Sequence, residues 1–251
     1  MTDITSRIIK GGALLEESRR FVDMWNCEAA PEENLAAFRG RNLLGKRSRA
    51  RAEDTIAILR QRFVDPGPEI ICALRRLALW ADVFRDACYF EAARNDRLLA
   101  YVAGTTLMGL ADRGWVKVTV EDVERALLDR PPSEAVNGWG EATRRRVVHG
   151  LLSALRDFGV LEGKASKHIA PPHITFGGFV YVLGRLRQTA TSSHEIVTHP
   201  CWRWWLLDSR RVRSFLLEAD REGILSFADA GSALRIDWRT DGLEEMVRVV
   251  A

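Results

Sequence analysis

Basic side chains are the chemically most distinctive groups in this sequence, and they occur in two clusters. The first cluster spans residues 39–51, where no acidic residue occurs between Glu33 and Glu53. Its members are Arg39, Arg41, Lys46, Arg47, Arg49 and Arg51. Such charges repel one another unless they are solvated or face an anion, and guanidinium groups suit bidentate contact with phosphate. We therefore predict that this segment faces phosphates; the alternative is an ordinary exposed surface helix.

The second cluster lies on a predicted helix that begins near Glu141. At 100° per residue, its apolar side chains share one face and its basic side chains occupy the other. The apolar face consists of Val147, Val148, Leu151, Leu152, Leu155 and Phe158. The opposite face carries Arg145, Arg146, His149, Ser153 and Arg156. This pattern predicts a buried face and a basic outer face, although solvated arginines on a surface helix would give the same pattern.

A glycine and a short basic hairpin are predicted to follow this helix. Gly159 stands where a helix C-cap needs a left-handed residue, and the apolar residues after it could begin a strand. Gly163 could turn that strand, with Lys164 and Lys167 on the turn. A helix with a basic outer face followed by a basic hairpin is how a winged helix meets a DNA groove.

Other candidate chemistry is weaker. Residues 40–46 have the glycine and lysine spacing of a phosphate-binding loop, but Arg47 replaces the Ser or Thr that would hold magnesium. No strand pattern precedes this segment. His194, His199 and Cys201 are close in sequence, yet no fourth metal ligand is evident. No serine elbow and no supported pair of catalytic carboxylates occurs. We therefore predict no cofactor, no metal and no enzymatic activity.

The elements that position these residues are predicted to be mainly helical, in three units. Residues 1–112 are predicted to form a helical domain that contains the first basic cluster. Residues 113–178 give strand, helix, helix and hairpin, the order expected of a winged-helix-like unit. Residues 179–251 are predicted to form a C-terminal helix-plus-hairpin unit. The fold class is thus mainly α, with an N-terminal helical domain followed by one or two small winged-helix-like units with short β-hairpins.

A repeated pattern supports the assignment of the C-terminal unit, while the secondary structure of one of its segments is left open. The order helix, glycine, strand, turn, strand occurs around residue 160 and again around residue 225, which predicts a second winged-helix-like unit. The apolar segment 176–186 fits either a strand or the start of a helix. Trp202, Trp204 and Trp205 are expected mostly in the core, packed between two domains.

Composition sets outer limits on these interpretations. The chain has 251 residues, with 47% hydrophobic and 28% charged residues, which is ordinary for a globular protein. A net charge of only +3 means that a nucleic-acid partner is indicated by clustering alone. Four scattered cysteines without a CxxC pair predict reduced, mostly buried thiols in a cytoplasmic protein. The apolar stretch 98–111 is too short to cross a bilayer, so we expect a buried core helix and no membrane association.

Three segments resemble the BrxA family, small components of the BREX phage-exclusion systems. The first is residues 8–19, IIKGGALLEESR, and the second combines NLLGKRSRA at 42–50 with ILRQR at 58–62. The third is the pattern of Trp139, Thr143-Arg144, Leu155 and Gly159. The resemblance covers most of the N-terminal two-thirds and is less clear after about residue 180.

The resemblance implies a non-enzymatic cytoplasmic component of antiviral defence that binds double-stranded DNA. It would act beside the methyltransferase, ATPase and phosphatase-like subunits of the system. We expect contact mainly with the phosphate backbone, and six neutralised phosphates would give a log–log salt slope of about −5 on duplex DNA. Two alternatives remain: an RNA-binding, antitermination-like regulator, and an adaptor that binds a BREX subunit through Trp202–Trp205.

Overall fold

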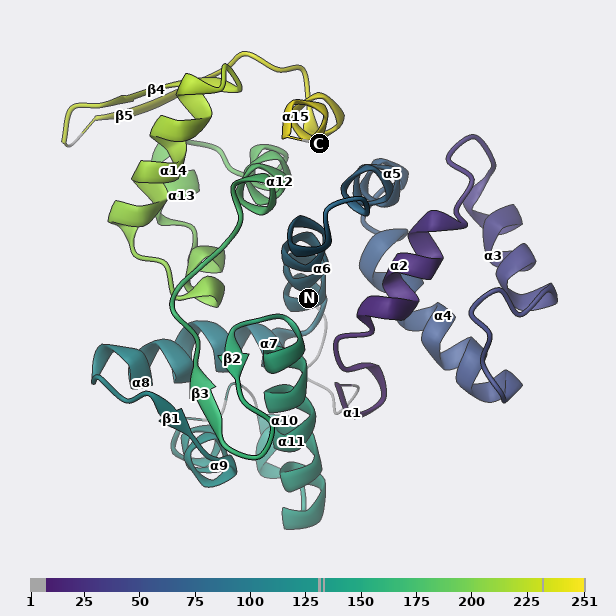
Figure 1. The fold of residues 1–251 in the computed structure, drawn as a ribbon. Coiled ribbons are helices and arrows are strands. Elements are labelled where there is room, and N and C mark those ends of the chain that lie inside the picture. The colour runs from purple at the N-terminus through teal and green to yellow at the C-terminus, as the bar shows by residue number, and fades with distance from the viewer. Residues whose placement is uncertain (1–7, 131, 133, 232, 251) are drawn as a thin grey trace.

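The protein is mainly helical, as the sequence predicts, in a computed structural model that describes residues 8–130, 132, 134–231 and 233–250 (Figure 1). Its first part consists of α1 (Ile8–Gly11), α2 (Leu15–Asp23), α3 (Pro31–Gly40), α4 (Arg49–Phe63), α5 (Pro68–Leu77) and α6 (Ala81–Asn95). A continuous helical run follows, made of α7 (Arg97–Tyr101), the π-helix η1 (Val102–Leu107) and α8 (Met108–Asp112). This run is the core helix predicted over 98–111, with one π-helical segment within it.

The middle part combines a small sheet with helices. Its elements are β1 (Lys117–Val118), α9 (Val120–Asp129), α10 (Glu134–Asn137), α11 (Glu141–Asp157), β2 (Leu161–Glu162) and β3 (Lys167–Ile169). The three strands pair antiparallel in the order β1-β3-β2, with Lys117 opposite His168 and Leu161 opposite Ile169. The strand predicted at the start of residues 113–178 is therefore present, but its ladder is only two residues long.

The C-terminal part repeats the pattern of helices followed by a hairpin. Its elements are α12 (Phe176–Arg187), α13 (Ser193–Thr198), the 3-10 helix η2 (Pro200–Trp205), α14 (Ser209–Arg221), β4 (Leu225–Asp229), β5 (Leu234–Trp238) and α15 (Leu243–Val250). Strands β4 and β5 pair antiparallel, with Phe227 opposite Ile236. The segment 176–186, open between strand and helix in the sequence, is helical because Thr175 caps it by accepting a hydrogen bond from Gly178.

Helices α6 and α12 form the centre of the molecule, and their approach requires glycine. A Cβ on Gly178 would lie 2.6 Å from the Cβ of Asp86, so a larger residue would force the two helices apart. One cluster of buried apolar side chains extends from Ile8 to Val247 through all three predicted units. The division into three domains at 112 and 178 remains a prediction.

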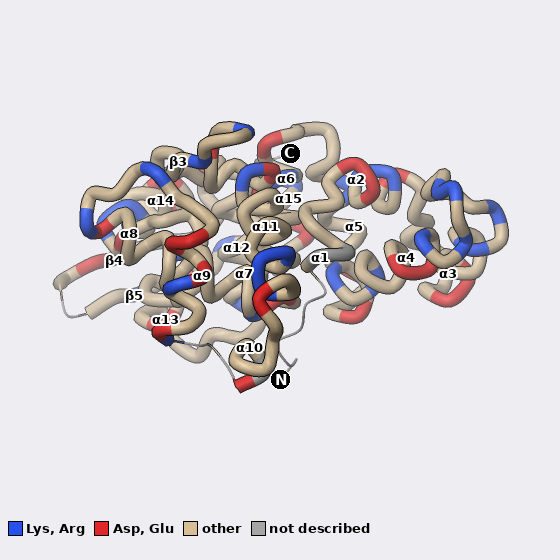
Figure 2. The backbone as a smooth tube through the Cα atoms, turned by 90° about the horizontal axis from the view of Figure 1, so that it is seen from below, with Lys and Arg blue, Asp and Glu red and all other residues tan. Residues whose placement is uncertain are grey.

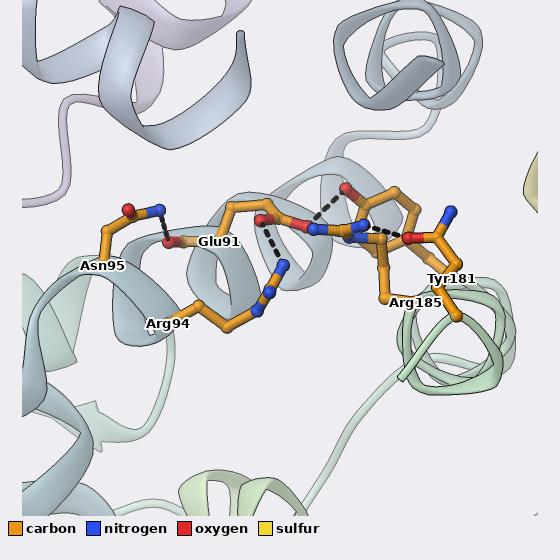
Figure 3. A network of polar contacts seen from close by, with 6 residues as sticks. Glu91, Arg94, Asn95, Tyr181 and Arg185 are labelled. Atoms are coloured by element: carbon orange, nitrogen blue, oxygen red, sulfur yellow. Dashed lines mark hydrogen bonds and ion pairs between the residues drawn. The ribbon is translucent and has the colours of Figure 1, made fainter. Parts of the chain in front are cut away.

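A buried ion pair crosses the interface between α6 and α12 (Figure 3). Oε1 of Glu91 accepts hydrogen bonds from Arg185 Nε at 2.7 Å and from the Tyr181 hydroxyl at 2.8 Å. Glu91 and Tyr181 are fully buried, and Arg185 is only 5% exposed. Burial and the neighbouring charge of Glu91 raise the pKa of Tyr181, so its hydroxyl remains a donor.

The prediction of four reduced cysteines is wrong for one pair. Cys27, in the loop after α2, and Cys72, on α5, form a disulfide with their Cα atoms 6.0 Å apart. Sequence spacing gave no sign of it because the two residues meet only when α2 packs against α5. Cys88 and Cys201 are free and buried, as predicted.

Candidate nucleic-acid interface

Helix α11 has the two faces that the sequence predicts. Its apolar residues from Val147 to Leu155 are buried against α9 and α1, whereas Arg145, Arg146 and His149 are exposed. Arg156, the last member of the predicted basic face, is half-buried. We call Arg145, Arg146, His149 and Arg156 the α11 basic face. The burial of its opposite side fixes this face toward solvent.

Gly159 ends α11 in the way that the sequence predicts. Its φ is +82°, and the N–H groups of Gly159 and Val160 donate to the carbonyls of Arg156 and Leu155, each at 2.9 Å. This pairing satisfies carbonyls at the helix end and turns the chain sharply into β2. The hairpin β2–β3 is therefore held beside the C-terminal end of α11.

Ion pairs divide the α11 basic face. Arg145 pairs with Glu121 of α9 at 3.3 Å, and Arg156 pairs with its neighbour Asp157 at 2.6 Å. Arg146 and His149 make no hydrogen bond or ion pair through their side chains with any described residue. Arg144, which the sequence prediction did not include, lies 3.9 Å from Glu124. Arg146 is thus the arginine of this face that an external anion meets without competition.

The hairpin between β2 and β3 carries both predicted lysines. Gly163, with φ +86°, makes the turn, and a Cβ there would lie 2.0 Å from the Ser166 carbonyl oxygen. Lys164 is exposed, and Lys167 is half-buried with its Nζ donating to the Lys164 carbonyl at 2.8 Å. We call these two residues the hairpin lysines. Lys164 lies in the turn and Lys167 is the first residue of β3, so both follow the α11 basic face closely in the chain.

The first basic cluster covers the end of α3, the connecting loop and the start of α4. We call its six residues, Arg39, Arg41, Lys46, Arg47, Arg49 and Arg51, the N-terminal basic segment. Ser48 caps α4 by accepting a hydrogen bond from the Arg51 N–H at 3.3 Å. The segment is exposed except for Lys46, which is half-buried.

Two of these six charges are neutralised by carboxylates from other parts of the chain. Arg39 pairs with Glu53 at 3.0 Å, and Lys46 pairs with Glu17 of α2 at 2.5 Å. Burial opposes ionisation of Glu17, but the hydrogen bond and charge of Lys46 outweigh it, so the pKa of Glu17 is lowered. The other members have no ion-pair partner among the residues that the structure describes: Arg41, Arg47, Arg49 and Arg51.

The two basic clusters occupy different parts of the surface. Helices α3 and α4 lie at one end of the molecule, whereas α11 lies nearer its middle (Figures 1 and 2). Helix α1 lies between them and contacts both α4 and α11. The N-terminal basic segment therefore lies apart from the α11 basic face, whereas the hairpin that carries the two lysines begins with β2, which contacts α11.

A third basic helix was not included among the predicted site residues. Helix α14 carries Arg210 and Arg221, which are exposed and unpaired within the described part of the chain. It ends at Gly223, with φ +74°, and continues into the β4–β5 hairpin. The repeated helix–glycine–hairpin pattern in the sequence was the signal that could have identified these arginines.

His199 and the tryptophan cluster have structural contacts. His199 Nδ1 accepts a hydrogen bond from the Cys201 N–H at 3.2 Å, and burial lowers the pKa of His199. No group of His, Cys, Asp and Glu that could hold a metal ion occurs among the described residues. Trp202 and Trp205 are buried, and Trp204 packs on Phe90 of α6 with ring centroids 5.7 Å apart. An adaptor could not use the buried rings of Trp202 and Trp205 as an exposed binding surface.

Within the described residues, no helix has the length and apolar character needed to cross a membrane. Residues 40–46 also lack the strand that a phosphate-binding loop requires, because α3 precedes them.

The fold and the basic surfaces together define a mainly helical protein in which a basic helix leads through a glycine into a short hairpin. The family model BrxA matches residues 4–177, more than half of the chain. The chain belongs to the BrxA family and is a component of a BREX phage-exclusion system, as the sequence resemblance predicts.

A solved structure of similar fold is the "Crystal structure of an uncharacterized protein from Magnetospirillum magneticum". It superposes with a TM-score of 0.58 at 16% sequence identity, covering 81% of this chain and 100% of that chain. At this identity the likeness concerns the fold alone. No curated protein matches the chain.

Proposed function

We propose that this protein binds double-stranded DNA, mainly through the phosphate backbone, as a non-enzymatic accessory component of its BREX system. The observation that carries the proposal is the arrangement around α11. The exposed basic face of this helix continues, through Gly159, into a hairpin that bears Lys164 and Lys167. An arrangement of this kind presents a helix to a groove and a hairpin to the adjacent backbone.

The order of elements supports the interpretation of residues 113–178 as a winged-helix-like unit. The helical run α7–η1–α8 is followed by β1, α9, α10, α11, β2 and β3, and the sheet order β1-β3-β2 places the first strand next to the last. Strand β2 contacts α11, which keeps the hairpin beside this helix. The second hairpin, after α14, supports a second unit of related design.

The distribution of ion pairs indicates which residues contribute most. Arg145 must exchange its contact with Glu121 for a phosphate, so part of the gain on binding is offset by the pair that is lost. Arg146 has no such competitor among the described residues. On the N-terminal basic segment, Arg47, Arg49 and Arg51 are free in the same sense and are expected to form a separate backbone contact.

The proposal is tested by fluorescence anisotropy of the protein on labelled duplex DNA across a salt titration. The double variant Arg145→Glu/Arg146→Glu should bind at least about tenfold more weakly, with a log–log salt slope shallower by about 1–2. The matched control is Arg76→Glu/Arg248→Glu, which reverses the same number of charges on α5 and α15, where both arginines contact Glu244. This control should keep most of the affinity.

Three further outcomes decide between the alternatives. Equal loss in the test and control variants would show that only total charge matters, and would remove α11 from the proposal. Tighter binding to an RNA duplex or single strand in direct competition would favour the RNA-binding regulator. If neither polymer binds at low salt, the surface arginines have another role, and contact with the methyltransferase, ATPase or phosphatase-like subunits would become the first hypothesis.

A further inference from the structure

A pocket of about 340 Å³ lies between α9 and the run α7–η1–α8. Its volume falls in the range of small-molecule sites. Both ends of α9 are fixed against the neighbouring chain. Thr119 and Asp122 form a capping box at its start, and the Tyr101 hydroxyl donates to the Arg130 carbonyl at 2.6 Å at its end. The pocket is therefore built by ordered elements.

An exposed tryptophan forms part of the pocket wall. Trp115 is 51% exposed and follows the end of α8. Gly114, with φ +75°, closes α8, and the Trp115 N–H donates to the Leu110 carbonyl at 3.0 Å. This hydrogen bond fixes the Trp115 backbone at the pocket, and the exposed indole ring offers a flat surface there. Such a surface is suited to stacking with another aromatic ring.

Three arginines line the same pocket without ion-pair partners among the described residues: Arg113, Arg125 and Arg130. Two carboxylates, those of Asp122 and Asp129, also line the pocket, and that of Asp122 accepts hydrogen bonds from the Thr119 N–H at 2.9 Å and from its hydroxyl at 2.7 Å. Three arginines against two aspartates leave the lining with a net positive charge. Unpaired guanidinium groups that line a cavity favour an anion, and phosphate above all.

The wall of the pocket that faces α9 includes a segment of irregular backbone. Residues Val102–Leu107 form a π-helix, a conformation that occurs frequently at functional sites. Thr106, within this segment, is 7% exposed and lines the pocket, and its hydroxyl has no hydrogen-bond partner among the described residues. A buried hydroxyl without a partner is unfavourable, so this wall of the pocket contains a polar group that the fold leaves unsatisfied.

We infer that this pocket binds a nucleotide, with the base stacked on Trp115 and the phosphate held by Arg113, Arg125 and Arg130. A phosphate ion alone would satisfy the arginines but leave the indole unused, and a nucleoside alone would do the reverse. The nucleotide has two possible sources, a free mononucleotide or one unit of a single strand. The site is distinct from the α11 basic face and does not depend on duplex binding.

Isothermal titration calorimetry on the full-length protein tests this inference with AMP, adenosine, inorganic phosphate and a short oligodeoxyadenylate. AMP should bind at least about tenfold more tightly than adenosine or phosphate, because only AMP has both a base to stack on Trp115 and a phosphate to contact the arginines. Arg125→Gln and Trp115→Leu should each weaken AMP binding at least about fivefold without changing Tm, since both side chains are exposed. Trp115→Phe should restore part of the affinity. Arg146→Gln, on α11 and outside the pocket, serves as the matched control.

The outcomes separate the two sources and the failure of the idea. Tight AMP binding with weak oligonucleotide binding identifies a free nucleotide, whereas the reverse identifies a unit of a single strand. The inference is overturned if millimolar AMP and the oligonucleotide both give no binding heat. It is also overturned if phosphate alone binds as tightly as AMP, or if Arg125→Gln and Trp115→Leu leave AMP binding unchanged.

Discussion

At the scale of single residues, long-range ion pairs decide which basic side chains remain available to a partner. The run from Arg39 to Arg51 has no acidic residue within it, yet Glu17 and Glu53 neutralise Lys46 and Arg39 in the folded protein. Surface pairs of this kind contribute little stability, about 0–1 kcal/mol, but they reduce the charge offered to an anion. The unpaired Arg47, Arg49 and Arg51 are therefore better candidates for mutation than the paired Arg39 and Lys46.

His199 gives the protein a pH-dependent contribution to stability near neutrality. Burial lowers its pKa, and its neutral Nδ1 accepts the Cys201 N–H at the start of η2. Because the folded state holds the proton less tightly than the unfolded state, this contribution is complete above the unfolded pKa of about 6.5. It falls as the pH decreases from there through the lowered folded pKa.

We expect urea unfolding of the wild type to show a loss of stability between pH 7.5 and 5.5 that is smaller in His199→Asn. The asparagine amide oxygen can accept the same N–H but does not titrate. His194→Asn, at an exposed position on α13, is the matched control and should follow the wild type. Parallel pH profiles for His199→Asn and the wild type would show that His199 does not contribute.

At the scale of elements, glycine at the helix ends determines how helices meet hairpins. Gly159→Ala should destabilise the protein by about 1–2 kcal/mol, because its φ of +82° places an L side chain in the left-handed region. Gly40→Ala, at a helical position where nothing lies within 4 Å of the added methyl, should be neutral or slightly stabilising. Urea unfolding midpoints measure both, and equal midpoints would contradict this account of Gly159.

The α6–α12 interface offers a second prediction at this scale. Glu91→Leu leaves the buried guanidinium of Arg185 without its carboxylate and should cost about 3–5 kcal/mol. The double variant Glu91→Leu/Arg185→Met buries neither charge, and should recover much of the loss. Chemical denaturation of the wild type, the single variants and the double variant completes a double-mutant cycle. A double variant less stable than Glu91→Leu would show that the pair is not the dominant interaction there.

At the scale of the whole molecule, one continuous core and one disulfide connect segments far apart in the chain. The Cys27–Cys72 bond closes a loop with a sequence separation of 45 residues. On the loop-closure model, such a crosslink stabilises the folded state by about 4 kcal/mol. The bond therefore restrains α3 and α4, the helices that carry the N-terminal basic segment, because both lie within the closed loop.

We expect reductant to lower the thermal unfolding midpoint of the wild type but not that of Cys27→Ser/Cys72→Ser. Under reductant the two proteins should unfold at similar temperatures. Cys88→Ala serves as a control that retains the disulfide, so its midpoint should still respond to reductant. A wild-type midpoint that is insensitive to complete reduction, verified by thiol titration, would argue against a stabilising role.

Features that depend on neighbouring residues can be predicted from the sequence. The buried face of α11, the capping box of Thr119 and Asp122, and the stops at Gly159 and Gly223 all follow from spacings of a few residues. Helical periodicity and capping chemistry act within one or two turns, so they are written in the local sequence. The mainly α fold and the two helix–glycine–hairpin units follow from the same local rules.

Contacts between residues far apart in the chain depend on the tertiary structure. The Lys46–Glu17 pair, the Cys27–Cys72 bond and the Arg185–Glu91 pair join residues 29, 45 and 94 positions apart. No spacing rule encodes such contacts, because they depend on which helices pack together. The pocket beside Trp115 has the same origin, since its walls come from α9 and from the helical run before it. Packing therefore decided which charges remain free and where a cavity forms.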